Sequence, residues 1–241
     1  MDVFEDWSND VSLVIEPYQT EEQESRVERA SKELFEYFEG IMEQRRREPQ
    51  DDMITALMNA EEEGDKLTHE ELLGTLMLLL VAGNETTRNL IGNGMLALLK
   101  HPDQLQRLRD NPDLLDSAVN ELLRYDSPVQ LDGRIAHEDL EIAGTQIQAG
   151  ERVISAIGAA NRDPAVFTDP NVLDIGRREK SHISFGRGIH HCLGAPLATL
   201  EGRIAFSSLL DRFPSMSLVA EPEFREQIVL RGVEELWVEV E

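Results

Sequence analysis

The feature that most constrains this chain is a helical pattern of about 30 residues that extends from Thr68 to about Lys100. Thr68 and Glu71 have the spacing of a capping box, which marks the start of the helix. At 1.5 Å per residue such a helix is roughly 45 Å long, so it would cross a whole domain. Because the run from Leu72 to Ala82 is apolar on most sides, we expect this part of the helix to be buried.

The other patterns predict a mainly α-helical chain with a small β part. Further helices are predicted at Glu21–Arg47, Asp52–Ala60, Pro102–Arg109, Pro112–Tyr125 and Ala195–Arg212. Short strands are predicted at Leu140–Ala143, Thr145–Ile147 and Arg152–Ile157, and along the tail Met216–Glu241 with a turn at Arg231–Gly232. An acidic turn is expected at Glu61–Asp65, and the apolar run Val11–Ile15 has no obvious partner before it.

Composition and charge exclude several classes of protein. The chain has 47 Asp and Glu against 23 Lys and Arg, a formal net charge of −24. This charge repels phosphate backbones and acidic lipid headgroups, so we expect no nucleic-acid partner and no membrane partner. A single cysteine excludes an internal disulfide and any multi-cysteine metal site. The acidic first ten residues do not form a signal peptide, and the longest apolar run is too short to span a bilayer, which predicts a soluble, cytoplasmic protein.

The segment richest in possible chemistry is Phe185–Gly194, which contains the only cysteine, Cys192. Its glycines permit backbone conformations closed to other residues and let a flat ligand approach the main chain. Cys192 comes just before a predicted helix, whose free amides would stabilise a thiolate. Three interpretations remain open from the residues alone: a small buried hydrophobe, a Cys/His nucleophilic pair, or a stabilised thiolate. Zinc bound by His190, His191 and Cys192 is a poor fit, because three consecutive residues rarely converge on one tetrahedral ion.

A second unusual segment, Ala82–Thr87, lies inside the long predicted helix. Small residues beside an acid and two hydroxyls favour a local break in the helical hydrogen bonds, with water or a ligand in the gap. The alternative is a stretch that faces solvent. A third pair, Glu121 and Arg124, has the spacing of an ordinary helical ion pair and is uninformative alone.

In this order and spacing, the segments resemble the cytochrome P-450 family of haem-thiolate monooxygenases, and its soluble bacterial members in particular. Phe185–Gly194 has every fixed position of the family's haem-binding loop, Phe-Gly-x-Gly-x-His-x-Cys-x-Gly. Ala82–Thr87 is similar to the oxygen-activation segment, and Glu121 with Arg124 matches Glu-x-x-Arg. Leu173–Arg177 is similar to Phe-Asp-x-x-Arg, with Leu173 in place of the usual aromatic residue. Asp132–Arg134 and Asn161–Pro164 also follow the bacterial pattern.

The resemblance implies a haem b cofactor, iron protoporphyrin IX, and a role for each matching residue. Cys192 would be the axial thiolate ligand of the iron, the type of ligation that favours O–O cleavage. His190 and Arg134 would pair with the haem propionates. Glu85 and Thr86 would be the catalytic acid–alcohol pair that delivers protons during oxygen activation, and Gly83 would make room for oxygen. The positions Phe185, Gly186 and Gly194 would shape the cofactor-binding loop.

The resemblance also implies supporting residues. Glu121, Arg124 and Arg177 would form a buried ion-pair triad that braces the loop. Val129 and Leu131 would line the substrate pocket. Arg187 occupies a variable position, where it is either a solvated arginine or a docking residue for an electron donor.

The implied reaction inserts one atom of O₂ into a small apolar organic substrate, with electrons from a separate ferredoxin and ferredoxin reductase. The sequence carries no flavin or nicotinamide motif of the Gly-x-Gly-x-x-Gly type. Family members are longer, so the resemblance describes residues 1–241 as a single partial domain, the C-terminal part of the cytochrome P-450 fold. This leaves two classes of function: a haem monooxygenase, or a catalytically inactive haem-binding or interaction fragment.

Overall fold

The computed structural model describes residues 3–62 and 67–241, and the chain divides into two compact units, one ending at Glu85 and the other beginning at Thr86. The two units meet within a single helix, α4 (His69–Lys100). The single partial domain expected over 1–241 stays a prediction. Positions 63–65 of the predicted acidic turn Glu61–Asp65 lie outside the described residues.

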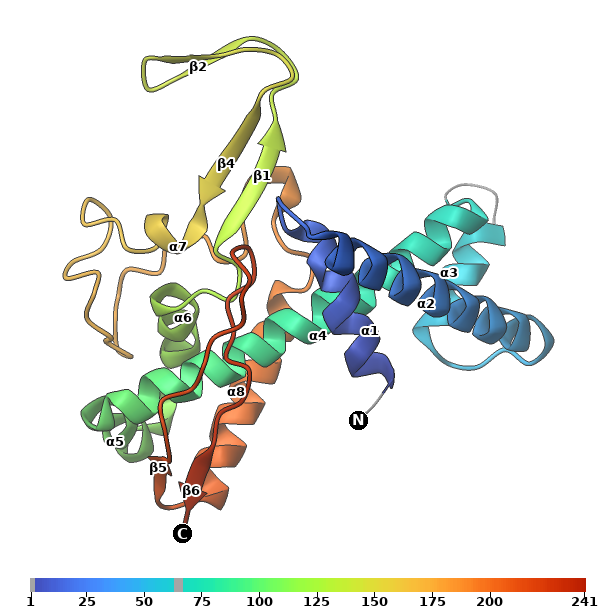
Figure 1. Ribbon diagram of the computed structural model, residues 1–241. Helices are drawn as coiled ribbons and strands as arrows, with labels where there is room; N and C mark the ends of the chain where they lie inside the picture. The colour runs from blue at the N-terminus through green and yellow to red at the C-terminus, as the bar shows by residue number, and fades with distance from the viewer. Residues whose placement is uncertain (1–2, 63–66) are drawn as a thin grey trace. The chain divides into compact units, whose positions relative to one another are not determined.

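The first unit is formed by helices: α1 (Val3–Ser12), the 3₁₀ turn η1 (Leu13–Ile15), α2 (Glu21–Arg47), α3 (Met53–Glu62) and the start of α4. Figure 1 shows α1 lying across α2. The apolar run at 11–15 therefore has a partner: Val11 and Leu13 are buried, and Asp10 forms an ion pair of 2.6 Å with Arg26 of α2. Helix α1 was not predicted, because its short pattern is interrupted by acids.

The core of the first unit is built from the inner faces of α2, α3 and α4. Its buried members are Leu34, Phe38, Met42, Met58, Leu72, Leu73 and Leu76. The predicted capping box is confirmed, since the Glu71 carboxylate accepts from the Thr68 amide at 2.7 Å and the Thr68 hydroxyl accepts from the Glu71 amide at 3.2 Å. The prediction that the run Leu72–Ala82 is buried is confirmed for one face only: Leu72, Leu73 and Leu76 are buried, but Leu78 is 65% exposed and Ala82 is exposed. One face of the helix packs on α2 and α3, and a hydropathy run cannot indicate which faces have partners.

The second unit combines the rest of α4 with α5 (Pro102–Asp110), η2 (Pro112–Leu114), α6 (Leu115–Tyr125), α7 (Ile157–Ala160), η3 (Gly188–His190) and α8 (Ala195–Arg212). Pro102 and Pro112 stand at the first positions of α5 and η2, as predicted. Helices α4, α6 and α8 pack closely: a Cβ on Gly202 would lie 3.2 Å from Leu90 and 3.4 Å from Val119. This contact forms the centre of the core, with Leu98, Leu122 and Phe206 fully buried.

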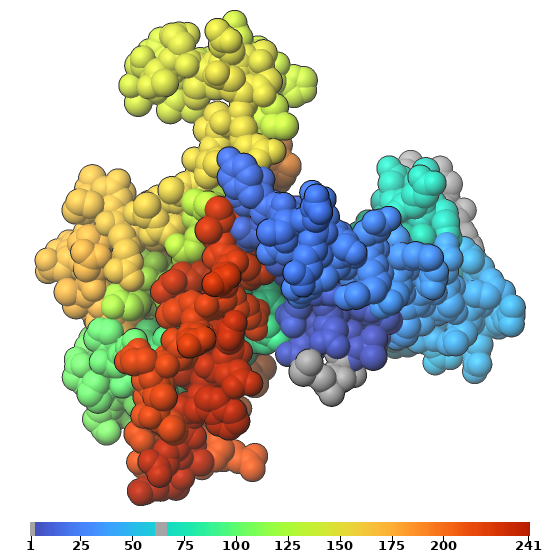
Figure 2. Space-filling view, viewed as in Figure 1, coloured from blue at the N-terminus to red at the C-terminus, as the bar shows by residue number. Residues whose placement is uncertain are grey.

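Three antiparallel pairs of strands complete the second unit: β1 (Leu131–Ile135) with β4 (Arg152–Ala156), β2 (Leu140–Ile142) with β3 (Thr145–Ile147), and β5 (Met216–Leu218) with β6 (Val238–Val240). The β2–β3 hairpin extends from the end of the β1–β4 pair (Figures 1 and 2). Strand β1 was not predicted. The tail forms strands only at its two ends, with isolated bridges between them, because Pro222 and the charged residues around it interrupt the alternation.

The mainly helical fold with short strands is confirmed. Among the described residues, no helix combines the length and the apolar character needed to cross a bilayer.

Candidate functional site

The segment Phe185–Gly194, called here the cysteine loop, connects the irregular chain after α7 to the start of α8. Its turns require glycine, because Gly186 has a φ of 68° and Gly188 a φ of 72°, where other residues are strained. The Cys192 amide donates to the Phe185 carbonyl over 2.9 Å, and the Gly186 amide donates to the Ile183 carbonyl over 2.8 Å. The loop is therefore closed on itself through its backbone.

The front of the cysteine loop carries an accessible thiol. Cys192 is exposed, and it is flanked by Ile189, 97% exposed, and Leu193, 91% exposed. Gly194, which follows Leu193, is the N-cap of α8, and a Cβ added to it would lie 3.8 Å from Cys192 Sγ. The small buried hydrophobe considered for Cys192 is therefore wrong for this structure. Within the ranges that the structure describes, no three His, Cys, Asp or Glu side chains gather into a group that could hold a metal ion.

A buried network of charged groups, Glu121 and Arg124 of α6 with Arg177, lies behind the loop and is connected to it through Asn161. Arg124 donates to both oxygens of Glu121 at 2.7 and 2.8 Å, and Arg177 Nε lies 3.1 Å from each. The side chains of Glu121 and Arg124 are only 1% exposed. Each guanidinium also donates to backbone carbonyls of the 161–172 segment, so the network fixes irregular chain to α6.

A second cluster, uncharged and buried, connects this network to the cysteine loop. The hydroxyls of Ser127 and Ser184 both donate to the Leu123 carbonyl, at 2.7 and 2.8 Å. Asn161 donates to both hydroxyls and accepts from the Ile183 amide at 2.8 Å. The cluster therefore joins three segments that are far apart in sequence, 123–127, Asn161 and 183–184, and the last of these directly precedes Phe185.

Sequence reasoning missed this cluster and the histidine beside it. No role is predicted for Ser127, Ser184 or His182, and Asn161 appears only as part of a motif. Most of their hydrogen bonds join positions 22 to 62 residues apart, so no local periodicity indicates them. The only available signal was the placement of polar residues immediately before the cysteine loop.

The segment Ala82–Thr87 lies in α4 across the boundary of the two units, with Gly83 and Glu85 in the first and Thr86 in the second. The helix continues through it without interruption, so the predicted break is wrong. Glu85 is 1% exposed and Thr86 is partly buried. Gly83 is exposed, and a Cβ added to it would meet no atom within 4 Å.

Three cationic or ionisable candidates lie on the surface of the second unit. Arg134 of β1 pairs with Asp132 two residues earlier and donates to the Gly133 carbonyl at 2.8 Å. His190 is exposed at the end of η3. Arg187 donates to the Ser181 carbonyl at 3.0 Å. All three side chains are accessible to a ligand or a partner.

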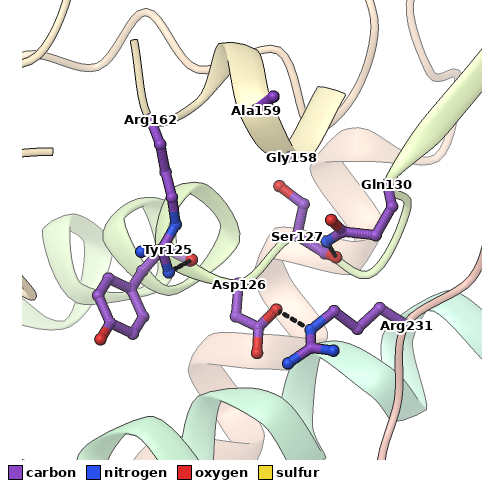
Figure 3. A pocket seen from close by; sticks show the side chains of 8 residues that line it. All are labelled: Tyr125, Asp126, Ser127, Gln130, Gly158, Ala159, Arg162 and Arg231. Atoms are coloured by element: carbon purple, nitrogen blue, oxygen red, sulfur yellow. Dashed lines mark hydrogen bonds and ion pairs between the residues drawn. The ribbon is translucent and has the colours of Figure 1, made fainter. Parts of the chain in front are cut away.

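A separate pocket of about 300 Å³ lies beside the end of α6 (Figure 3). It is lined by Tyr125, Asp126, Ser127, Gln130, Gly158, Ala159, Arg162 and Arg231. Asp126 and Arg231 form an ion pair of 2.7 Å, and burial raises the pKa of Asp126 while the charges of Arg231 and Arg162 oppose this rise. Val129 and Leu131 are not among the lining residues, so this polar pocket is distinct from the predicted apolar substrate pocket.

Comparison with known proteins identifies the family. The family model "Cytochrome P450" matches residues 4–231. Cytochrome P450 CYP107DY1 of Priestia megaterium is 49% identical to this chain, over 91% of this chain and 53% of its own length. The biotin biosynthesis cytochrome P450 of Bacillus subtilis is 50% identical, over 85% of this chain and 52% of its own length. The crystal structure of P450BioI with an acyl-ligated acyl carrier protein superposes with a TM-score of 0.94 at 45% identity, covering 99% of this chain and 61% of that one.

The chain therefore belongs to the cytochrome P450 family, and it spans about half the length of these curated relatives. The cofactor of this family is haem b. The residues present fit such a group: the donors are one accessible thiol with an imidazole and a guanidinium, suited to an iron and two carboxylates. The exposed Ile189 and Leu193 would be covered by a flat apolar ring, and a Cβ added to Gly188 would meet no atom within 4 Å, so the main chain is open to close approach.

Proposed function

We propose that the chain carries the haem-binding and oxygen-activating part of a monooxygenase that inserts one oxygen atom of O₂ into a small apolar organic substrate. The observation that carries this proposal is the exposed Cys192 thiol, placed just before α8 on a backbone-closed loop and backed by the buried network. Haem b bound there would supply the oxygen activation and electron transfer that no side chain can provide.

Each candidate residue of the site would have a defined role. Cys192 would ligate the iron as a thiolate, stabilised by the positive end of the α8 dipole. Phe185, Gly186 and Gly194 would shape the cysteine loop for close approach, and His190 and Arg134 would neutralise the two propionates.

The α4 segment would supply protons. Gly83 would leave room above the helix, while Glu85 and Thr86 would hold and move protons through a carboxylate and a hydroxyl. Electrons would come from an external ferredoxin and its reductase.

The first experiment is the carbon-monoxide difference spectrum of the haem-reconstituted, dithionite-reduced chain, compared with Cys192→Ser and His191→Ala. We expect the red-shifted Soret band of a thiolate-ligated haem in the wild-type chain and in His191→Ala, and its loss in Cys192→Ser. A red-shifted band that persists in Cys192→Ser contradicts the ligand assignment.

The proton-delivery role is tested in preparations that turn over with a redox partner. In Thr86→Ala, more of the electrons consumed should leave as hydrogen peroxide and fewer as product, whereas the neighbouring Thr87→Ala should couple like the wild type. Equal coupling in Thr86→Ala and wild type would remove Thr86 from the mechanism.

A second candidate function, a catalytically inactive haem-binding or interaction fragment, is favoured by one observation. Leu197, Leu200 and Ile204 of α8 are 58%, 47% and 56% exposed, at the spacing of a single helical face. If the reconstituted chain shows no thiolate-type band, this second function is preferred for residues 1–241.

A further inference from the structure

The segment that leads into the cysteine loop is held in place at every residue from 182 to 185. Ile183 donates its amide to Asn161, Ser184 donates its hydroxyl to the Leu123 carbonyl, and the Phe185 carbonyl accepts from Cys192. Any shift of this segment is transmitted to Cys192 through the last of these bonds.

His182 connects the same segment to α6. Its Nε2 lies 3.3 Å from Asn120 Oδ1, and its Nδ1 lies 3.1 Å from the Ser184 hydroxyl and 3.4 Å from the Ser184 amide nitrogen. The ring also contacts the Phe185 ring, with centroids 6.1 Å apart. His182 thus touches α6 and two residues of the segment at once.

The hydrogen-bond network assigns the tautomer of His182. Asn120 donates its amide nitrogen to the Asp116 carbonyl at 2.7 Å, which leaves Oδ1 as the acceptor facing the ring. Nε2 must therefore carry the proton, and Nδ1 is free to accept from the Ser184 amide. The neutral imidazole makes the bonds to Asn120 and to the Ser184 amide, while the Ser184 hydroxyl, which donates to the Leu123 carbonyl, lies 3.1 Å from Nδ1 without donating to it.

The surroundings oppose a charged ring. Burial, followed by the charges of Arg187 on the cysteine loop and Arg124 on α6, lowers the pKa of His182 to about 4, and Glu121 on α6 opposes this shift. The Glu121 carboxylate is already bound to two guanidiniums, so it offers little further compensation. In an opened segment, the same ring would take up a proton at its ordinary pKa.

We propose that neutral His182 is a positioning residue for Cys192, tying the entry of the cysteine loop to α6, and that its protonation in acid releases the loop. The role of Cys192 as an iron ligand rests on the function proposed above. The contact between His182 and α6 is a property of the chain itself and can be measured without haem.

The test is amide hydrogen exchange of the 182–192 segment between pH 8 and pH 5, corrected for intrinsic rates. If the open segment has a His182 pKa of 6.5 and the closed segment one of about 4, opening becomes about 30-fold more favourable by pH 5. His182→Gln keeps an amide but cannot be protonated in this range, so its opening should not change with pH. The exposed His137→Gln is the matched control and should behave like the wild type.

The proposal is overturned if His182→Gln keeps the wild-type pH dependence, or if the wild type shows none. Should His182→Gln fail to fold, the NMR titration of the His182 ring in the wild type decides: a midpoint far below 6.5 supports the proposal and a midpoint near 6.5 overturns it. These results are independent of the carbon-monoxide spectrum, so a chain that lacks a thiolate-type band can still show the pH-dependent loop. In a haem-loaded chain, the band should weaken toward pH 5 in the wild type and persist in His182→Gln.

Discussion

The two sides of the cysteine loop differ in how their side chains are satisfied. Behind the loop, Glu121 and Arg124 are 1% exposed and each makes several hydrogen bonds. In front of it, Ile189 and Leu193 are more than nine-tenths exposed and the Cys192 thiol is accessible. One side fixes the backbone and the other offers groups to a ligand, so stability and chemistry should respond to different substitutions.

Glu121→Gln should disrupt the buried network behind the loop and cause the largest loss of stability. It would remove the carboxylate that compensates two buried guanidiniums, and removing one partner of a buried ion pair costs about 3–5 kcal/mol. Urea denaturation at pH 7 measures this loss. Arg203→Gln is the control, since its 2.7 Å ion pair with Asp116 is exposed at 45% and 64% and should contribute at most about 1 kcal/mol. Equal losses of unfolding free energy in the two variants would mean that burial of the network does not add to its contribution to stability.

Acid should lower the stability of the structure behind the cysteine loop, because it protonates His182. Its pKa is lower in the folded chain than in the unfolded one, so the unfolded state binds more protons between pH 6.5 and about 4, and stability falls as the pH falls through this window. The difference contributed by His182 should reach about 2 kcal/mol at pH 5 and vanish above pH 7. Comparing urea midpoints of the wild type and His182→Gln at pH 5 and pH 7 isolates this contribution from that of the carboxylates. A constant difference between the two proteins across this range would contradict it.

The turns of the loop should be moderately sensitive. Gly188→Ala places a Cβ in open space, but it forces alanine to a φ of 72°, which costs about 1 kcal/mol. Gly133→Ala in β1 also meets no atom within 4 Å and lacks a positive φ, so it should cost less. Thermal denaturation of the two variants separates backbone strain from steric contact, and a Gly188→Ala variant as stable as Gly133→Ala would exclude strain.

Much of the helical framework could be predicted from the sequence because it depends on local periodicity. The helices at 21–47 and 195–212 have the predicted bounds, and the capping box at Thr68 and Glu71 forms as expected. The exposed face of α4 and the strand β1 could not be predicted, since both depend on which neighbours are present. For the site, the motif located Cys192 and the charged network, while the hydrogen bonds of His182 and Asn161 follow only from tertiary contacts.

The smallest effect on stability is expected at the residue with the largest expected effect on chemistry. Cys192→Ser replaces an exposed sulfur by oxygen, and the amide that holds the loop to Phe185 is part of the backbone and is retained. The free energy of unfolding should therefore change by less than about 0.5 kcal/mol, while the thiolate-type haem spectrum is lost. A large loss of stability in Cys192→Ser without haem would show that the thiol itself supports the loop. The spectrum of that variant would then report a damaged fold, and the front and back of the loop would no longer be separable.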